Sequence, residues 1–375
     1  MRARRYLFSP IDADLDEKMV FLSGPRQVGK TTLALDLVGA ADARHPAYLN
    51  WDDVRARPRI RNGELPAGEP RVILDEVHKY ARWRGLVKGL HDTREPGQSL
   101  LVTGSARLDV YRRGGDSLQG RYHPYRLHPL SLSEVGGGSA ELEALLRFGG
   151  FPEPFFKASQ RHWQRWHRER LDRVVRDDVR DLERVRELSL IELLIDALPP
   201  RVGSPLSIKN LREDLEVAHD TAERWIGILE NLFVCFRIAP HGASAIRAVK
   251  KERKLYLWDW SLVENAGARF ENLVASHLLK LCHYLEDTEG ERMELRFLRD
   301  STGREVDFVV LKGKKPLFAV EAKAGEQSAS PALKYFKERV GIPRWYQVHL
   351  GSKDVVSDGL RILPLAALCK ELGIP

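Results

Sequence analysis

The sequence predicts an α/β protein that is divided into several domains, and three observations support this fold class. The 375 residues are too many for one comfortable hydrophobic core. Near the N-terminus, an apolar strand leads into a glycine-bounded loop and then into a helix with leucines at helical spacing. Near the C-terminus, apolar strands follow a long amphipathic helix. We therefore expect a nucleotide-binding α/β domain first and a second α/β domain last.

Composition and charge narrow the class of protein. Hydrophobic residues make up 43% of the chain and charged residues 30%, which is ordinary for a globular protein. The formal net charge of +7 makes a polyanion a plausible partner without establishing one. No stretch approaches the roughly 18 apolar residues of a membrane span, and no apolar signal region follows the basic N-terminus. The cysteines Cys235, Cys282 and Cys369 lack metal-ligand spacing, so we expect a reduced, cytoplasmic protein without structural zinc.

The first motif is a phosphate-binding loop. The segment "GPRQVGKT" fits G-x-x-x-x-G-K-T, with a strand before it and a helix after it. Two glycines let successive N–H groups point at phosphate oxygens, and the helix adds its positive N-terminal end. We expect Lys30 to contact the β- and γ-phosphates of ATP and Thr31 to hold Mg²⁺. The predicted nucleotide-binding residues are Gly24, Pro25, Arg26, Gln27, Val28, Gly29, Lys30, Thr31 and Thr32.

The second motif, "RVILDEVHKY", places paired acids directly after a strand that reads as fully buried. Asp75 is expected to bind the water shell of Mg²⁺, and Glu76 to polarise the attacking water as general base. Acidic turns often end strands, but downstream of a phosphate loop these residues read as the Walker B pair. The presence of both acids favours hydrolysis over nucleotide binding alone.

Two further residues complete the predicted nucleotide site. Ser105, at the tip of the strand "SLLVTGSAR", is expected to sense the γ-phosphate, with Thr103 as the fallback and a plain polar turn as the alternative. Arg121 is expected to reach a neighbouring subunit's nucleotide as an arginine finger. Its rivals are Arg107, Arg112 and Arg113, and most surface arginines are merely solvated.

The middle of the chain predicts a charged helix and a winged helix-turn-helix. Residues 161–188 read as a helix of mixed charges, a pattern that is usually a solvated face with i,i+4 pairs. Its tryptophans mark a lid on the ATPase or a subunit contact; we favour the lid, with the charges mostly structural. Residues 204–238 read as helix, turn, helix and strand, followed by a basic wing that contains Lys250, Lys251 and Lys254. We expect the wing to make backbone contacts with nucleic acid without sequence specificity. A purely structural role is the alternative.

The C-terminal region predicts a helix, three strands, a helix and a strand, the order used by the PD-(D/E)xK nuclease fold. Glu305 and Asp307 share one strand face, and Glu321 and Lys323 share one on the next strand. We expect Asp307 and Glu321 to bind Mg²⁺ or Mn²⁺, Lys323 to position water, and Glu271 to complete the catalytic group from the preceding helix. One lysine is too few for three clustered acids, which favours a bound cation. An exposed salt bridge from Lys323 to Asp307 is the alternative.

These motifs together resemble a known family. "GPRQVGKTT", "ILDEVHK", "TGSAR", "GRYHPYRLHPLSLSE" and "FGGFPEPF" occur in an order that resembles prokaryotic AAA+-type ATPases with a C-terminal DUF4143 region. The resemblance runs from about residue 18 to about residue 345. It departs at His78, where members often have Gln, and in "KKERKLYLWDWSL", which lacks the usual proline and Asp-Gly-Leu. It implies an ATPase fused to a winged-helix-like segment and a PD-(D/E)xK nuclease-like domain.

The predicted fold is therefore a P-loop NTPase (AAA+-like) domain with a helical lid, a winged-helix segment and a nuclease-like α/β domain. We place these domains at residues 1–138, 139–188, 189–262 and 263–375. The expected function is ATP hydrolysis coupled to DNA binding or processing, in repair or defence, with metal-dependent cleavage at the last domain. The expected partners are DNA and further copies of the chain, with nucleotide at subunit interfaces. Alternatives are an ATP-switched regulatory or scaffold protein and a signalling-type ATPase.

Overall fold

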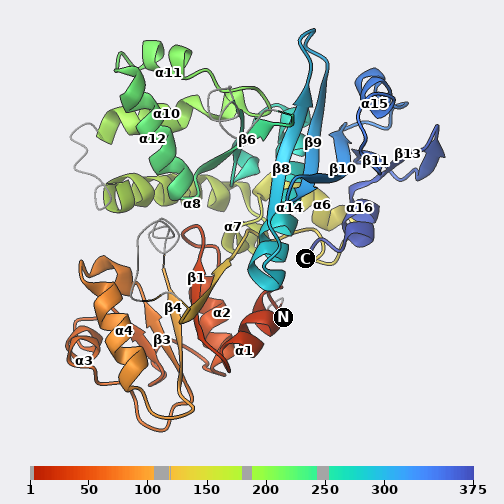
Figure 1. Cartoon of the computed structure of the whole chain (residues 1–375). Coiled ribbons are helices and arrows are strands. Elements are labelled where there is room, and N and C mark those ends of the chain that lie inside the picture. The colour runs from red at the N-terminus through yellow and green to blue at the C-terminus, as the bar shows by residue number, and fades with distance from the viewer. Residues whose placement is uncertain (1–3, 105–117, 119, 180–187, 243–252) are drawn as a thin grey trace. The chain divides into compact units, whose positions relative to one another are not determined.

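The computed structural model describes residues 4–104, 118, 120–179, 188–242 and 253–375 (Figure 1). The chain divides into two compact units, Met1–His128 and Pro129–Pro375. Each unit is described by itself. In the described part of the chain, no helix combines the length and the apolar character that a membrane span requires.

The N-terminal unit is built on a parallel sheet. Its strands are β1 (Met19–Ser23), β2 (Tyr48–Asn50), β3 (Arg71–Asp75), β4 (Ser99–Thr103) and β5 (Tyr122–Arg126). They pair in parallel in the order β2-β3-β4-β1-β5. The strand that leads into the glycine-bounded loop is therefore separated from the strand that ends in Asp75 by β4 alone. Both motifs consequently lie at the carboxyl edge of the same sheet, as the predicted P-loop NTPase fold requires.

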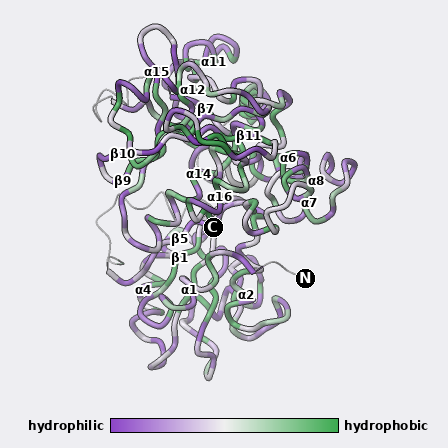
Figure 2. Tube along the Cα trace, turned by 90° about the vertical axis from the view of Figure 1, so that its right-hand side faces the viewer, coloured by the Kyte–Doolittle hydropathy of each residue, from purple (hydrophilic) through white to green (hydrophobic). Residues whose placement is uncertain are grey.

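Helices cover both faces of this sheet, which explains why its strands read as nearly continuous apolar runs. The helices are α1 (Phe8–Asp14), α2 (Lys30–Leu37), α3 (Ala56–Asn62) and α4 (Trp83–Thr93), with a 3₁₀ turn η1 (Val77–Lys79) after β3. Figure 1 shows α3 and α4 on one side of the strands and α1 and α2 on the other. The tube along β1 is coloured hydrophobic in Figure 2.

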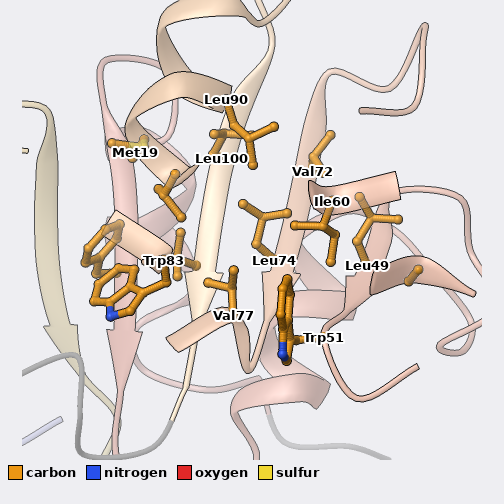
Figure 3. Close-up of a cluster of buried hydrophobic side chains, with 14 of the residues drawn as sticks. Met19, Leu49, Trp51, Ile60, Val72, Leu74, Val77, Trp83, Leu90 and Leu100 are labelled. Carbon is orange, nitrogen blue, oxygen red and sulfur yellow. The ribbon is translucent and has the colours of Figure 1, made fainter. Parts of the chain in front are cut away.

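Figure 3 shows the apolar layer between the sheet and the α3 and α4 side. Alternate strand residues such as Met19, Leu74 and Leu100 meet Ile60 of α3 and Trp83 of α4, and all five are buried. At about 25 cal/mol per Å² of buried apolar surface, such a layer is the main stabilising contribution in this unit. It anchors β3 and β4, whose ends carry the acidic site.

The C-terminal unit contains a mixed sheet of eight strands in the order β12-β13-β11-β10-β9-β8-β6-β7. Their bounds are β6 (Cys235–Pro240), β7 (Lys254–Leu257), β8 (Met293–Arg299), β9 (Glu305–Lys312), β10 (Lys315–Ala322), β11 (Trp345–His349), β12 (Val355–Ser357) and β13 (Leu360–Pro364). Strands β8, β9 and β10 are antiparallel, whereas β11 pairs with β10 and β13 in parallel.

The helical elements of this unit lie before, between and after its strands in the sequence. They are α6 (Ser139–Phe148), α7 (Pro152–Lys157), α8 (Gln160–Arg173), the π-helical η3 (Val174–Val179), α10 (Leu188–Ala197), η4 (Pro199–Arg201), α11 (Ile208–Asp214), α12 (His219–Asn231), η5 (Trp260–Leu262), α14 (Ala266–Glu289), α15 (Pro331–Lys337) and α16 (Leu365–Leu372).

The predicted order of helix, three strands, helix and strand is present as α14, β8, β9, β10, α15 and β11. The predicted helix, turn, helix and strand is present as α11, α12 and β6. Strand β6 also pairs with β8, so the sheet continues across the domain boundary that we predicted between residues 262 and 263. The PD-(D/E)xK and winged-helix assignments themselves stay predictions.

The charged segment 161–188 is less uniform than its sequence predicted. Helix α8, largely purple in Figure 2, ends at Arg173 and passes into the π-helical η3, while residues 180–187 lie outside the described residues. The Trp163 indole donates to Ser261 Oγ at 2.9 Å, and buried Trp166 packs on Phe151. Arg170 is also buried, with its guanidinium 4.2 Å from the Phe151 ring centroid, so the solvated-face interpretation is wrong for this residue. The apolar neighbours of α8 stabilise it within this unit.

The glycine pair of "FGGFPEPF" yields a stability prediction. A Cβ on Gly150 would lie 2.5 Å from Trp260 Cη2 and 2.7 Å from the Leu130 carbonyl oxygen. Gly150→Ala should therefore lower the free energy of unfolding by about 1–3 kcal/mol through overpacking. Gly227→Ala, within α12 and with open space around it, should leave stability unchanged or raise it by up to ~1 kcal/mol. Chemical denaturation of both variants checks the pair, and equal stabilities would contradict the packing described.

Candidate functional site

The glycine-bounded loop connects β1 to α2. The nine residues predicted to bind nucleotide lie on this loop and on the first turn of α2. Gly24 and Gly29 have φ of 150° and 100°, and Gln27 has φ of 62°. A Cβ on Gly24 would lie 2.5 Å from the Leu127 carbonyl oxygen, so this position requires glycine both for its backbone angle and for space. The helix that starts at Lys30 adds its positive end to the loop.

Lys30 is buried, and its side chain folds back onto the start of this loop. Its ammonium donates to the carbonyl oxygens of Gly24 at 2.9 Å and Pro25 at 2.8 Å. Phosphate oxygens are charged and accept stronger hydrogen bonds than carbonyl oxygens do. A phosphate group bound in the loop would therefore compete with these two carbonyl oxygens for the hydrogen bonds of the Lys30 ammonium.

Arg5 supports the loop from outside the motif and was not identified from the sequence. Its buried guanidinium donates to the Val28 carbonyl oxygen at 2.6 Å and to that of His128. The two contacts span 23 and 123 positions in the sequence, so no local pattern could have revealed them.

Asp75, at the carboxyl end of β3, is the centre of a hydrogen-bond cluster. Thr31 Oγ1 donates to Asp75 Oδ2 at 3.2 Å, and the Tyr48 hydroxyl donates to the same oxygen at 2.5 Å. Thr103 Oγ1 donates to Asp75 Oδ1 at 2.5 Å. Sequence reasoning had named Thr31 and Thr103 but missed Tyr48, which lies 27 residues away on β2. The cluster joins α2, β2 and β4 to the acid.

Thr31 and Asp75 fit a Mg²⁺ ion in chemical terms. A hydroxyl and a carboxylate oxygen already within hydrogen-bond distance of each other are hard oxygen ligands of the kind Mg²⁺ prefers beside phosphates. The residues that would hold the ion are therefore these two.

Glu76 follows Asp75 in a left-handed conformation, with φ of 57° and ψ of 17°. Positive φ is unusual for a residue other than glycine, and it often marks functional positions. Glu76 Oε2 lies 3.6 Å from Lys79 Nζ and 3.6 Å from His78 Nε2. Burial raises the pKa of Glu76, and Asp75 raises it further, while Lys30, Lys79 and Arg26 oppose the shift. A partly buried carboxylate with a raised pKa is suited to accept a proton from water.

The two remaining predicted nucleotide contacts are Ser105 and Arg121. Ser105, Arg107, Arg112 and Arg113 lie outside the described residues. Arg121 precedes β5, and the neighbouring Tyr122 pairs with Met19 at the start of β1, so Arg121 lies at the sheet edge opposite the loop. Its Nε is 3.3 Å from Asp92 Oδ1. Arg121 therefore lies too far from the loop of its own subunit, and its action on a neighbour's nucleotide stays a prediction.

The C-terminal unit brings Glu271, Asp307, Glu321 and Lys323 together, as the strand pattern suggested. Asp307 Oδ2 accepts from the Ala322 N–H at 3.0 Å, and Glu321 Oε2 accepts from the Asp307 N–H at 3.3 Å. Lys323 Nζ pairs with Glu321 at 2.8 Å rather than forming the alternative bridge to Asp307. Burial raises the pKa values of Glu271 and Glu321, and Asp307 raises both further.

Lys254 is the unexpected member of this cluster. We had placed it in the exposed basic wing, and that prediction is wrong: it is fully buried at the start of β7. Its Nζ lies 2.7 Å from Glu305, 3.0 Å from Glu271 and 3.2 Å from Asp307. Burial alone would lower the pKa of Lys254, but Asp307, Glu271 and Glu305 together raise it. Because its neighbours in the sequence are basic, Lys254 was predicted to be exposed, although its side chain is buried.

These residues do not fit the divalent metal that the nuclease prediction requires. Within the described residues, no three His, Cys, Asp or Glu side chains are arranged to hold a metal ion. The three carboxylates that could surround one already surround the Lys254 ammonium. Asp307 and Glu321 are thus adjacent, as predicted, but a lysine ammonium lies beside Asp307 where the nuclease prediction expected a metal ion.

Three family models match successive parts of the chain. Residues 16–136 match a family described as "AAA domain", residues 139–272 match "Domain of unknown function (DUF8612)", and residues 266–368 match "Domain of unknown function (DUF4143)". The chain therefore carries an AAA-type ATPase domain of the P-loop class and a C-terminal DUF4143 region, and the resemblance inferred from the sequence is confirmed.

Two curated relatives are similar over part of their length. The uncharacterized protein Rv2008c of Mycobacterium tuberculosis is 27% identical over 252 residues, which cover 65% of this chain and 55% of that protein. The uncharacterized protein MJ1544 of Methanocaldococcus jannaschii is 22% identical over 372 residues, covering 88% of this chain and 81% of that protein. This chain thus spans only about half the length of the mycobacterial relative.

Two solved structures show weaker similarity. The Aeropyrum pernix ORC1 protein in complex with DNA is 16% identical, with a TM-score of 0.35, over 72% of this chain and 94% of that chain. The Thermotoga maritima RuvB Holliday junction branch migration motor is 18% identical, with a TM-score of 0.32, over 62% of this chain and 87% of that chain.

The Asp75 cluster generates a prediction about metal dependence. Tyr48→Phe removes one hydroxyl that orients the Asp75 carboxylate but keeps the ring in place. The Mg²⁺ concentration for half-maximal ATP turnover should rise by about 10- to 100-fold, as when supporting contacts around a metal ligand are lost. Tyr346→Phe, which removes a hydroxyl bonded to Glu371 in the other unit, should change nothing. An unchanged Mg²⁺ requirement in Tyr48→Phe would contradict the role given to Asp75.

Proposed function

We propose that this chain binds ATP with Mg²⁺ at the loop between β1 and α2 and hydrolyses the γ-phosphate bond. The observation that supports this most directly is the placement of Asp75, within hydrogen-bond distance of Thr31 and followed directly by Glu76. A loop that only bound nucleotide would not need a second, partly buried carboxylate with a raised pKa beside it. The AAA-type domain matched over residues 16–136 agrees with this proposal.

Each side chain has a separate task in this reaction. The Lys30 ammonium exchanges its loop carbonyl partners for phosphate oxygens and stabilises the charge of the transferring group. Thr31 and Asp75 would hold Mg²⁺, and the ion would supply positive charge beside the phosphates. Glu76 accepts the proton of the attacking water. Lys79, which also pairs with Asp52, holds Glu76 by one carboxylate oxygen.

We further propose a nucleic acid as the partner on which the ATPase acts. The net charge of +7 and the basic run that contains Lys250 and Lys251 support a non-specific phosphate-contacting surface. Both lysines lie outside the described residues, and Lys254 no longer contributes to that surface. The partner, the predicted self-assembly and the pathway are proposals for the whole protein.

The buried Lys254 favours the alternative in which the C-terminal unit binds rather than cleaves. We had predicted metal-dependent cleavage at Asp307 and Glu321, assisted by Lys323. Because a lysine already neutralises the acids, an ATP-switched protein with a nuclease-like binding module is the better-supported form of the proposal.

Two substitutions test the ATPase proposal. Lys30→Ala should reduce turnover about 100-fold or more by removing charge stabilisation from the phosphates. Glu76→Gln should retain ATP binding yet lose about 100-fold or more of turnover, because only the base is removed. Phosphate release and nucleotide binding should be measured for each, with and without DNA. The control is Glu95→Gln, an exposed glutamate ahead of β4 at the opposite edge of the sheet. Near wild-type hydrolysis by Glu76→Gln would show that the base is another group.

The predicted arginine finger requires mixed assemblies. Arg121→Ala should bind ATP normally but lose turnover if Arg121 acts on a neighbour's nucleotide. Mixing it with Lys30→Ala protein should restore part of the activity, because some interfaces then pair an intact loop with an intact arginine. Turnover in mixtures shown to co-assemble is the measurement. Failure of that rescue would remove Arg121 from the site.

A further inference from the structure

The carboxylate cluster of the C-terminal unit has an internal cation. Lys254 is fully buried, and its ammonium lies between 2.7 and 3.2 Å from one oxygen each of Glu305, Glu271 and Asp307. An ammonium group has three N–H donors and no acceptor, so three carboxylate partners saturate it. The three acids come from β9 and α14, whereas the lysine comes from β7.

Uncharged groups also donate to these acids. The Tyr256 hydroxyl donates at 2.8 Å to Glu271 Oε1, the oxygen that Lys254 also contacts, and the Ala322 N–H donates to Asp307 Oδ2 at 3.0 Å. Lys323 neutralises Glu321 at 2.8 Å. Arg299 also lies 3.6 Å from Glu305. The cluster is therefore a set of four acids whose partners are two lysines, one arginine and uncharged donors.

The backbone closes over this cluster from one side. Gly203 has φ of 76°, and a Cβ there would lie 3.1 Å from both carboxylate oxygens of Glu271. A metal ion would need oxygen ligands at about 2.0–2.6 Å, together with open positions for water or a phosphodiester. Lys254 and the backbone at Gly203 occupy the surroundings of Glu271 that such a centre would use.

We propose that Lys254 is the resident cation of this cluster, in the position that a divalent metal would need, so that the C-terminal unit neither binds metal there nor cleaves phosphodiesters by metal catalysis. This inference concerns the C-terminal unit alone and is independent of whether the chain hydrolyses ATP. A metal ion beside Lys254 would be repelled by the ammonium at close range, in surroundings that screen charge poorly.

The test measures Mn²⁺ binding to the full chain without nucleotide, by electron paramagnetic resonance of free Mn²⁺. Wild-type protein and Asp307→Asn should bind Mn²⁺ equally, because any ion at Thr31 and Asp75 is common to both. Lys254→Met should bind one more Mn²⁺ ion than wild type, at the carboxylate cluster. The affinity of this cluster for Mn²⁺ should rise on the order of 100-fold, because the substitution removes an adjacent positive charge. Lys254→Met/Asp307→Asn should lose that gain.

Lys323→Met is the matched control, because Lys323 is 38% exposed and pairs with Glu321 alone. It should gain no ion. If Lys254→Met fails to fold, the wild-type comparison still decides. The change in melting temperature between chelator and Mn²⁺ should be the same for wild type and for Asp307→Asn, because only an ion at Thr31 and Asp75 contributes to it. A wild-type Mn²⁺ site that Asp307→Asn abolishes, or metal-dependent DNA cleavage that Asp307→Asn abolishes, would overturn the proposal. A folded Lys254→Met that gains no Mn²⁺ would also overturn it.

Discussion

A single buried carboxylate, that of Asp75, joins most of the elements that form the nucleotide site. Burying a charge is costly unless hydrogen bonds compensate for the lost water, and here hydroxyls from Thr31, Tyr48 and Thr103 supply them. The three donors come from α2, β2 and β4, so the acid can be satisfied only when these elements are correctly placed around β3. The order β3-β4-β1 brings the loop and the acid to the same edge. These hydrogen bonds hold the acid in a fixed position, and fixed charges are what electrostatic catalysis requires.

The C-terminal unit also contains buried carboxylates, but it stabilises them with cationic side chains. Its carboxylates cluster at Glu271, Glu305, Asp307 and Glu321, and the protein's own lysines neutralise them. In the N-terminal unit, uncharged hydroxyls stabilise Asp75 and leave its charge available to a metal ion. In the C-terminal unit, the buried ammonium of Lys254 cancels the charge from within. The two acidic centres therefore differ: the first fits the proposed Mg²⁺-dependent ATP hydrolysis, and the second stabilises the fold.

The sequence predicted the features that depend on neighbouring residues. Loop spacing located Lys30 and Thr31, and an apolar run before two acids located Asp75 and Glu76, because each pattern is contained within about ten residues. The helix and strand order of the C-terminal region followed from periodicity in the same way. Tyr48, Arg5 and Lys254 were missed because their roles depend on pairing between segments that are distant in sequence. Lys254 was assigned to the wing since its neighbours are basic, although strand β7 directs its side chain into the acids.

Anomalous diffraction from crystals grown with Mn²⁺ and a non-hydrolysable ATP analogue would test both centres in one measurement. We predict a manganese peak beside Thr31 and Asp75, next to the phosphates of the analogue. We also predict clear density for the Lys254 side chain between Glu271, Glu305 and Asp307, with no manganese peak among them. A manganese peak bound by Asp307 and Glu321, with Lys254 displaced, would contradict the role assigned to Lys254.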